Sequence, residues 1–462
     1  MTVVVTSRRP FAVLLTLALG FVMAMLDVTA VNVALPEIAL DLQVPLTGLV
    51  WVVDGYTLTF AALLLAGGAL ADRYGPKALY QAGLAIFLAG SALCGLAPDG
   101  VALTGARLLQ GAGAALFMPS SLSLLTHSYE DPALRTRMLG AWSALVGVAG
   151  ASGPLVGGLL VHQFGWRSVF WVNLPLGLLA ITMAQLLLAA PPKQARALSL
   201  SSHALGVAAL AGLSFVLIEG PVLGWLAPAV LLALAMTLAA GAALLQRERR
   251  GSHPLLPPEL FHSSSFAAAN GVGFLINFCV FGQLFLLSLY MQHASGADAL
   301  QAGLRLLPMM AAYTVGNFLA GGLAARHGTR RPMLLGLLVA SGMALLLVAL
   351  QWSSRQALPY GVLVPVTVLM NLAIGIAIPA MTATVMQVAG RQHANSAAAA
   401  LNANRQIGAL VGVALAGSLL QMAPGWPLRI SIAYGAVALA YALAAALVLR
   451  RIAPLAGIAT PA

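Results

Sequence analysis

Long apolar stretches alternate with short polar connections along the whole chain. About fourteen of these stretches reach the roughly 20 residues that a membrane-spanning helix needs. Their approximate limits are 11–34, 48–70, 79–97, 101–125, 137–160, 168–190, 203–219, 226–246, 266–290, 301–324, 333–351, 359–387, 396–421 and 428–450. They lack the alternation of a barrel strand, so their backbones must be satisfied within helices. The pattern predicts an all-α polytopic membrane protein.

Composition supports this class. The chain is 60% hydrophobic and only 8% charged, with a mean hydropathy of +0.94, whereas soluble proteins carry about 25% charged residues. The net charge of +11 comes from small basic groups between apolar runs, not from an extended basic face, so we expect no nucleic-acid partner. Cys94 and Cys279 both lie inside apolar runs, which favours small buried hydrophobic residues over a disulfide.

The basic residues also predict the orientation of the helices. Arg8 and Arg9 precede a first apolar run that lacks a cleavage-site pattern, which indicates a retained span. With that end in the cytoplasm, most of the 23 Lys and Arg residues fall on cytoplasmic segments. The exceptions are Arg167, Arg305, Arg355 and Arg429 on the outer side, and Arg107 and Arg405 within helices. Both termini are therefore expected in the cytoplasm.

One phrase occurs twice, as GALADRYGPK (68–77) and GGLAARHGTR (321–330). Both copies follow a long apolar run and lie on the predicted cytoplasmic side, eight helices apart. This separation indicates two six-helix halves with two further helices placed between them. We therefore predict an N-terminal half at 1–190, a linker with two extra helices at 191–262 and a C-terminal half at 263–462. Parallel repeats of this kind are a known plan of transporters.

Six phrases in this order resemble the major facilitator superfamily, specifically its fourteen-helix drug:proton antiporter family. They are LDVTAVNVALP (26–36), GALADRYGPK (68–77), RLLQGAGAA (107–115), GPLVGG (153–158), GWRSVFWVNLPLG (165–177) and NANRQIGALVGVALAG (402–417). One departure is Ala149, where the family pattern usually has glycine. The resemblance implies the major facilitator fold and proton-coupled efflux of amphipathic, cationic small molecules or drugs by alternating access across the bacterial inner membrane.

Charged residues inside predicted spans are functional candidates, because burying a charge in lipid is costly. Asp27 and Arg107 are the first of these, and the resemblance implies that they couple transport to protons. Arginine does not deprotonate in proteins, so its role would be electrostatic. The structural alternatives are an Asp27 that is hydrogen-bonded to backbone or to Asn32, and a fixed ion pair at Arg107.

Other polar and aromatic residues are candidates for a substrate cavity: Asn32, Asp54, Phe117, Trp142, Phe281, Tyr313, Asn402 and Arg405. Asp54 lies near Trp51 and Tyr56, so a solvated or paired acid at the outer interface is an equal alternative. Glu219, at the end of an inserted helix, is better explained as structural. Aromatic residues at helical spacing are also typical of plain packing.

The repeated phrase predicts a cytoplasmic gate made of Gly68, Asp72, Arg73, Gly75 and Lys77. Its glycines would permit close approach and a tight turn, and its charges would pair across helix ends. The second copy has Ala325 in place of Asp72, so only the first copy has an acidic residue that could form such a pair. A basic turn that only sets topology is the alternative. The phrase at 153–158 supplies the antiporter motif Gly153, Pro154, Gly157 and Gly158, which favours close helix packing and a bend.

The sequence contains no catalytic or cofactor motif. Its eight histidines lie in loops or at helix edges, and no metal-binding or ATP-binding pattern is present. We therefore expect no enzyme activity, metal, cofactor or ATP, and a monomer whose partners are small molecules, protons and the lipid bilayer. A narrow metabolite exporter or an importer of the same fold is the alternative within transport. A polytopic membrane enzyme or sensor is the alternative outside it.

Overall fold

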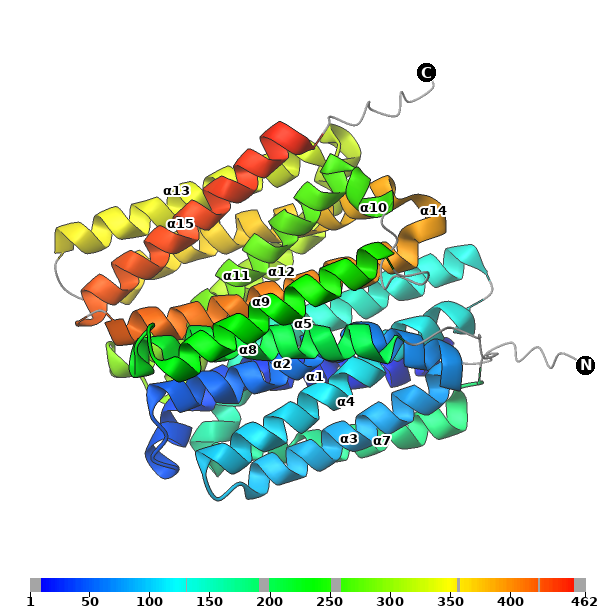
Figure 1. The fold of residues 1–462 in the computed structure, drawn as a ribbon, viewed down its shortest axis with the longest axis horizontal. Coiled ribbons are helices and arrows are strands. Elements are labelled where there is room, and N and C mark those ends of the chain that lie inside the picture. The colour runs from blue at the N-terminus through cyan, green and yellow to red at the C-terminus, as the bar shows by residue number, and fades with distance from the viewer. Residues whose placement is uncertain are drawn as a thin grey trace, which may run out of the picture. The chain divides into compact units, whose positions relative to one another are not determined.

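A computed structural model describes residues 10–129, 131–190, 199–250, 259–354, 358–422 and 424–452. The regular structure within these ranges is helical (Figure 1). Fourteen helical segments are long and apolar enough to span a membrane, which confirms the predicted helix number and the all-α class. The predicted linker region, 191–262, includes 191–198 and 251–258, which lie outside the described residues.

The helices follow one another in the order of the predicted apolar runs. The elements are α1 (Pro10–Asp41), α2 (Leu46–Tyr74), α3 (Pro76–Leu96), α4 (Gly100–Ser128), α5 (Pro132–Phe164), α6 (Ser168–Trp171), α7 (Asn173–Leu187), α8 (Leu200–Leu223), α9 (Pro228–Arg250), α10 (Glu259–His262), α11 (Ser264–His293), α12 (Ala299–His327), α13 (Arg330–Ser354), α14 (Tyr360–Met422) and α15 (Trp426–Arg451). The short α6 and α7 together make one span, Ser168–Leu187. The long α14 contains Gly390 at φ 66° and makes two spans, Tyr360–Gly390 and Ser396–Gln421.

Several helices extend beyond the apolar runs that predicted them. The run at 48–70 lies in α2, which continues through the polar residues that follow and ends at Tyr74. The next residue, Gly75, has φ 99°, a conformation that favours glycine, and its N–H bonds to the Ala71 carbonyl. At the start of α4, the Asp99 side chain accepts a hydrogen bond from the Ala102 N–H at 2.8 Å. Local turn and cap chemistry therefore sets these ends.

The chain divides into two compact units. The first contains 1–211 together with 298–303, and the second contains 212–297 and 304–462. The proposal that 191–262 is an insertion between two six-helix halves remains a prediction.

Small residues bring the helices of the first unit together. A Cβ added to Gly83 of α3 would lie 2.8 Å from the Gly113 carbonyl oxygen of α4, and one added to Gly113 would lie 2.7 Å from the Gly83 oxygen. On α2, Thr59 donates a hydrogen bond to the Leu108 carbonyl of α4 at 2.8 Å. In lipid, where apolar side chains gain little from leaving the solvent, such close backbone approach holds helices together.

The second unit uses the same packing. A Cβ on Gly282 of α11 would lie 2.8 Å from the Gly412 carbonyl oxygen of α14, and Ser341 of α13 donates to the Ala438 carbonyl of α15 at 2.9 Å. Helix α9 differs, because only Val230 and Ala240 are buried along it. Its remaining apolar surface suits contact with lipid tails.

Candidate functional site

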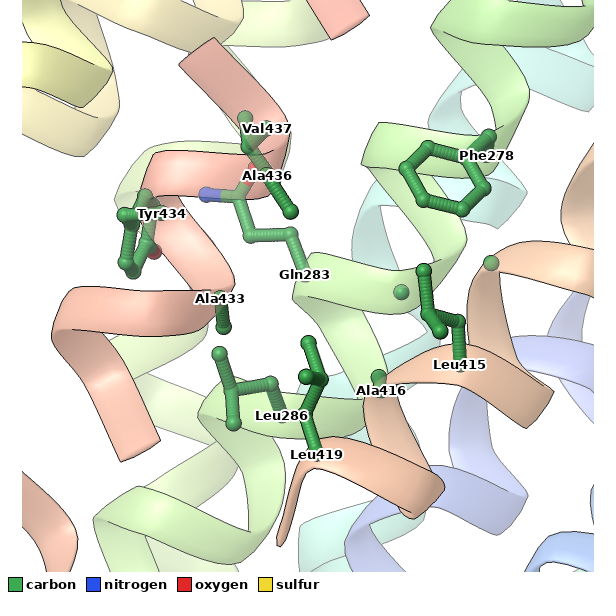
Figure 2. A pocket seen from close by; sticks show the side chains of 12 residues that line it. Phe278, Gln283, Leu286, Leu415, Ala416, Leu419, Ala433, Tyr434, Ala436 and Val437 are labelled. Atoms are coloured by element: carbon green, nitrogen blue, oxygen red, sulfur yellow. The ribbon is translucent and has the colours of Figure 1, made fainter. Parts of the chain in front are cut away.

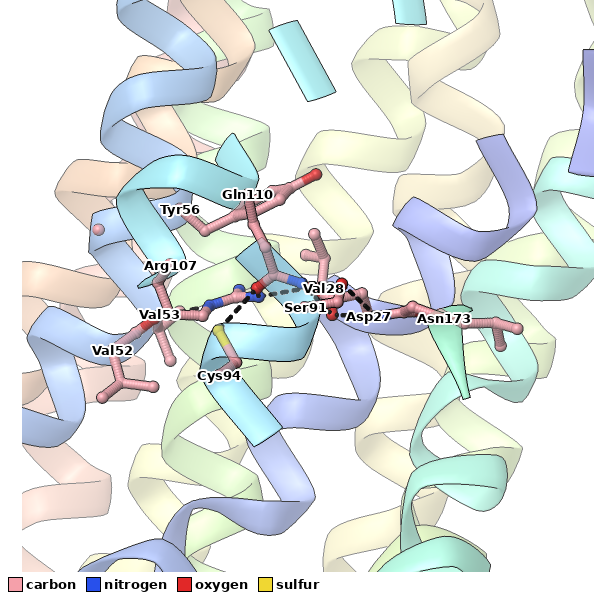
Figure 3. A network of polar contacts seen from close by, with 12 residues as sticks. Asp27, Val28, Val52, Val53, Tyr56, Ser91, Cys94, Arg107, Gln110 and Asn173 are labelled. Atoms are coloured by element: carbon pink, nitrogen blue, oxygen red, sulfur yellow. Dashed lines mark hydrogen bonds and ion pairs between the residues drawn. The ribbon is translucent and has the colours of Figure 1, made fainter. Parts of the chain in front are cut away.

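Asp27 of α1 and Arg107 of α4 form a buried ion pair inside the first unit (Figure 3). The Arg107 Nη1 lies 2.5 Å from the Asp27 Oδ2, and each residue is only 1% exposed. A lone charged side chain at the centre of a span costs about 2.5–3.5 kcal/mol, and pairing offsets this cost. Asn32, which was a candidate partner of Asp27, donates instead to the Val28 carbonyl at 2.9 Å.

Two further side chains hold the other oxygen of Asp27. Asn173 Nδ2, at the start of α7, donates to Asp27 Oδ1 at 2.9 Å, and Gln110 Nε2 of α4 donates to the same oxygen at 3.2 Å. Both amides also donate to the Ser91 hydroxyl of α3, at 3.3 and 2.7 Å. The Cys94 thiol donates to Gln110 Oε1 at 3.2 Å. Four helices therefore meet around one carboxylate, as Figure 3 shows.

The guanidinium of Arg107 makes further contacts beside the ion pair. Its Nε donates to the Val52 carbonyl of α2 at 3.0 Å, and its Nη1 also donates to Gln110 Oε1 at 2.8 Å. The rings of Tyr56 and Phe170 lie 4.6 and 5.8 Å from its central carbon. Since arginine keeps its proton, Asp27 is the member of this pair that can exchange one.

Four residues of this network were missed as site residues in the sequence: Ser91, Cys94, Gln110 and Asn173. Gln110 follows Arg107 by three residues, which places both on one helix face. Asn173 lies within the phrase at 165–177 that was compared with the family, but its amide gave no sign of a distant partner. Uncharged polar residues are common in spans, so the rule that singled out Asp27 does not single out these residues.

Asp54 of α2 is fully buried, and neither of its carboxyl oxygens has a hydrogen-bond partner among the described residues. The alternative of a solvated or paired acid at the interface is therefore wrong. Trp51 and Tyr56 suggested an interfacial depth, but side-chain packing removes Asp54 from water at this place.

The structure changes the interpretation of several residues that were predicted to line a substrate cavity. Phe117 is fully buried and packs edge-on against Tyr80 and Phe87, at centroid distances of 6.3 and 5.7 Å, so it belongs to the core. Trp142 is half-buried and meets the Phe21 ring at 4.6 Å. Asn402 is exposed. Aromatic side chains at helical spacing serve packing as readily as binding, which explains the error at Phe117.

In the second unit, Phe281 is half-buried on α11. Tyr313 of α12 hydrogen-bonds to Asn317 and interacts electrostatically with Arg405 of α14. A separate narrow pocket opens between α11, α14 and α15, and Figure 2 shows the side chains that surround it. Its walls are apolar apart from Gln283 and Tyr434. The residues predicted for the substrate cavity do not line this pocket.

The antiporter motif lies next to the ion pair. A Cβ on Gly153 of α5 would collide with Thr29 of α1, and one on Gly157 would lie 2.7 Å from the Ala30 Cα. Pro154 and Gly158 are buried on the same helix. The predicted close packing is therefore present, and it fixes α5 against the segment of α1 that directly follows Asp27.

In the repeated phrase, Gly75 and Gly328 occupy the same position of the two copies and have φ values of 99° and 72°. The tight turn predicted at Gly75 is confirmed. The close approach predicted at Gly68 is wrong, because a Cβ added there would meet no atom within 4 Å. The neighbouring Gly67 makes that approach instead, against the Ala115 carbonyl of α4.

The final basic residue of each copy binds the carbonyl end of a helix in its own unit. Lys77 Nζ donates to the Gln185 and Leu188 carbonyls at 3.2 and 2.8 Å, at the end of α7. Arg330 Nη2 donates to the Leu449 carbonyl at 2.9 Å, near the end of α15. Cations are stabilised at helix C-termini, where carbonyls lack helical partners. The repeated basic residue thus has a packing role in both copies.

The remaining charges of the first copy lie on its exposed side. Asp72 is half-buried, and Arg73 is exposed and lies over the Tyr74 ring, 5.5 Å from its centroid. The role of this loop as a gate stays a prediction.

A family model described as Major Facilitator Superfamily matches this chain over residues 17–413 and 269–461. The chain belongs to the major facilitator superfamily. It is 47% identical over 96% of its length to the methylenomycin A resistance protein of Bacillus subtilis (strain 168), and covers 94% of that relative. The Streptomyces coelicolor protein of the same name is also 47% identical, with coverage of 92% and 89%. Multidrug resistance protein Stp of Mycobacterium tuberculosis is 34% identical, with coverage of 90% and 76%.

Solved structures agree on the fold of this major facilitator. A crystal structure of the peptide transporter POT in complex with sulfate gives a TM-score of 0.72 at 14% identity, with coverage of 95% and 93%. The POT family transporter PepTSo gives 0.68 at 17% identity, with coverage of 96% and 97%. The predicted fold and family are therefore confirmed, and the chain is a multi-pass membrane protein of a transporter family.

In this major facilitator, replacing Lys77 by methionine should lower the thermal melting midpoint slightly, by about 1 °C. The variant keeps the aliphatic stem but loses the charge that binds the end of α7, a contact of about 0.3–1 kcal/mol for an exposed helix end. Melting of the purified protein, followed by tryptophan fluorescence, measures the effect. Lys77→Arg should melt close to the wild type, whereas equal losses in both variants would contradict a charge-based role.

Proposed function

We propose that this protein is a proton-coupled exporter of amphipathic small molecules that works by alternating access. The observation that carries the proposal is the buried Asp27–Arg107 pair, whose carboxylate is held by three donors within a membrane-spanning unit. Charged groups within membrane spans are costly and commonly mark proton or ion pathways. The names of the relatives, which are resistance proteins, support export over import.

Proton binding at Asp27 would change the balance of this network. The ionised carboxylate accepts from Arg107, Gln110 and Asn173. A protonated carboxyl loses its charge and turns one acceptor oxygen into a donor, so it attracts the guanidinium much less. Proton and substrate would then favour different conformations, and each shifts the equilibrium only by its differential affinity for the two states.

The gate belongs to the same proposal. Gly68, Asp72, Arg73, Gly75 and Lys77 would stabilise one conformation at the cytoplasmic side and release on conversion to the other. The positive-inside pattern supports cytoplasmic termini. Because the relatives reported above are bacterial, we place the protein in the bacterial plasma (inner) membrane, as a monomer without enzyme activity.

Methylenomycin A is the first compound to test. Two relatives at 47% identity are named for resistance to it, and this observation favours a narrow exporter as the second candidate function. Stp, named as a multidrug resistance protein, is more distant at 34% identity. A broad exporter would also carry structurally unrelated dyes such as ethidium, and a narrow one would not.

Flux in proteoliposomes tests the proposed function. Purified protein is reconstituted, and uptake of methylenomycin A and of ethidium is measured with and without an imposed pH gradient. We expect uptake to accelerate when the interior is acidic, because inward substrate movement is then exchanged for protons leaving the vesicle. Proton-coupled transport of these compounds would be contradicted if the uptake rate of both were the same with and without the pH gradient. It would also be contradicted if both rates equalled those of protein-free vesicles.

A further inference from the structure

The C-terminal part of the chain is almost free of acidic residues. Between residue 260 and the C-terminus the sequence contains a single one, Asp298. Asp298 precedes α12, where its side chain accepts a hydrogen bond from the Gln301 N–H at 2.8 Å. The spans formed by α11 to α15 therefore contain no carboxylate that could neutralise a cation among them.

Arg405 lies within this acid-free set of spans. It belongs to the second span of α14, Ser396–Gln421, nine residues after its start, which is about 14 Å along the helix and near the middle of a membrane. Its side chain is half-buried, and its Nε is buried without a hydrogen-bond partner among the described residues. No ion pair in the described part of the chain involves Arg405.

The acid on the inserted helix α8 is out of reach. Ser418, which lies on the same span as Arg405, donates to the Leu217 carbonyl of α8 and so marks the depth of Glu219. Thirteen residues separate Arg405 from Ser418, which is about 20 Å along a helix. Glu219 therefore lies too far along the span to pair with Arg405.

The surroundings of Arg405 leave room for its stem and place one phenol near its charge. A Cβ added to Gly273 of α11 would lie 3.5 Å from the Arg405 Cγ and 3.5 Å from the Met381 Cε. Tyr313 of α12 interacts electrostatically with Arg405, and its side chain is hydrogen-bonded to Asn317. Within the described residues, no carboxylate forms an ion pair with the guanidinium of Arg405.

The two membrane arginines of the chain therefore differ. Arg107 has a carboxylate, an amide oxygen and a backbone carbonyl as acceptors, whereas the Nε of Arg405 is buried without an acceptor among the described residues and no ion pair there involves it. The unpartnered Asp54 is not comparable, because a buried carboxyl becomes neutral by binding a proton. A guanidinium does not lose its proton in proteins, so Arg405 keeps a positive charge that requires an anion.

We propose that Arg405 is a substrate subsite for a carboxylate, so that the preferred cargo is an amphipathic acid and not a cation. This inference rests on the proposed function and replaces the cationic class that the family resemblance implied. A planar guanidinium binds a carboxylate through two parallel hydrogen bonds, which fixes both charge and orientation. Met381 and Leu401 lie with the Arg405 stem around Gly273 of α11, so the neighbourhood of this arginine is apolar.

Binding of three probes with one aromatic body and different charges tests this proposal. The probes are pyrenebutyrate, its neutral amide and pyrenebutylamine, and their affinity for purified protein in detergent is measured by fluorescence anisotropy. We expect the wild type to bind the acid about tenfold tighter than the amide, as a partly exposed charge pair would give. The amine should bind no tighter than the amide.

Variants of Arg405 test whether this residue causes the preference for the acid over the amide. Arg405→Gln should bind acid and amide equally, and Arg405→Lys should retain part of the preference because it keeps the charge without the paired donors. Arg305→Gln is the matched control, since Arg305 is a half-buried arginine of α12 that lies over the Tyr360 ring at 5.6 Å. That control should keep the full preference for the acid.

The proposal is overturned if the wild type shows no preference for the acid, if no acid binding is detected, or if the preference survives in Arg405→Gln. Should Arg405→Gln fail to fold, Arg405→Lys and the wild-type comparison of the three probes still decide. Binding in detergent needs no proton gradient. A failure of gradient-driven flux therefore counts against the proposed function, whereas a missing acid preference counts against the role of Arg405.

Discussion

Asp27→Asn should stop efflux driven by a pH gradient while the protein still folds and inserts, with a lowered melting midpoint because Arg107 is left without an anion. The substitution keeps the size of the side chain and an acceptor oxygen, but it removes the group that can exchange a proton. Arg107 retains the Val52 carbonyl and the Gln110 amide oxygen as acceptors. We expect gradient-driven uptake of methylenomycin A to fall to the rate of protein-free vesicles, as measured in proteoliposomes.

Asp41→Asn provides the matched control for this experiment. Asp41 is also an acid of α1, and its Oδ2 lies 2.5 Å from Arg167 Nη1, but the two side chains are 46% and 38% exposed. Exposed ion pairs contribute little to stability, typically below about 1 kcal/mol. Because the Asp41 carboxylate is in contact with water, its charge needs neither a partner nor a proton. Normal proton-driven uptake by Asp27→Asn would remove Asp27 from the mechanism.

The helix number followed from the sequence because membrane insertion depends on local properties. A stretch of roughly 20 apolar residues must become a helix in lipid whatever its neighbours are. The break at Gly390 within α14 shows the same principle, since the polar segment between two apolar runs marked two spans within one long helix. The turn at Gly75 was equally local, because a glycine between two helices permits a positive φ.

The pairing of the site residues was not accessible in the same way. Asp27 and Arg107 were recognised one by one, because each is a charge within a span. Their contact joins residues 80 positions apart, and the Asn173 contact with Asp27 spans 146 positions. Hydropathy is a local property of the sequence and does not predict contacts between residues so far apart along the chain. Only the packing of α1, α3, α4 and α7 around one point brings these side chains together.

The packing of the folded chain also changed the interpretation of individual residues. Asp54 was placed at an interface by its aromatic neighbours, yet it is fully buried. Phe117 was a cavity candidate and is core. Lys77 was predicted as a gate charge, with a topogenic basic turn as the alternative, and it also binds the carbonyl end of α7. In each case the residue type was informative, but its partner depended on a helix distant in sequence.

Arg107→Met should destabilise the protein strongly as well as uncouple it. Removing one partner of a buried ion pair leaves the other charge uncompensated, which costs about 3–5 kcal/mol. Gln110 and Asn173 still donate to Asp27, but neither carries a charge. We expect a marked drop in the thermal melting midpoint of the purified variant, and no gradient-driven uptake.

The double variant Asp27→Asn with Arg107→Met separates stability from coupling. It removes both charges, and since replacing a whole buried pair is often neutral for stability, its melting midpoint should return towards that of the wild type. Its gradient-driven uptake should nevertheless remain absent, because the proton-exchanging group is gone. If instead the two substitutions lowered the midpoint additively, the charges would not be coupled in the folded protein, and a proton bound at Asp27 would have no means of releasing Arg107.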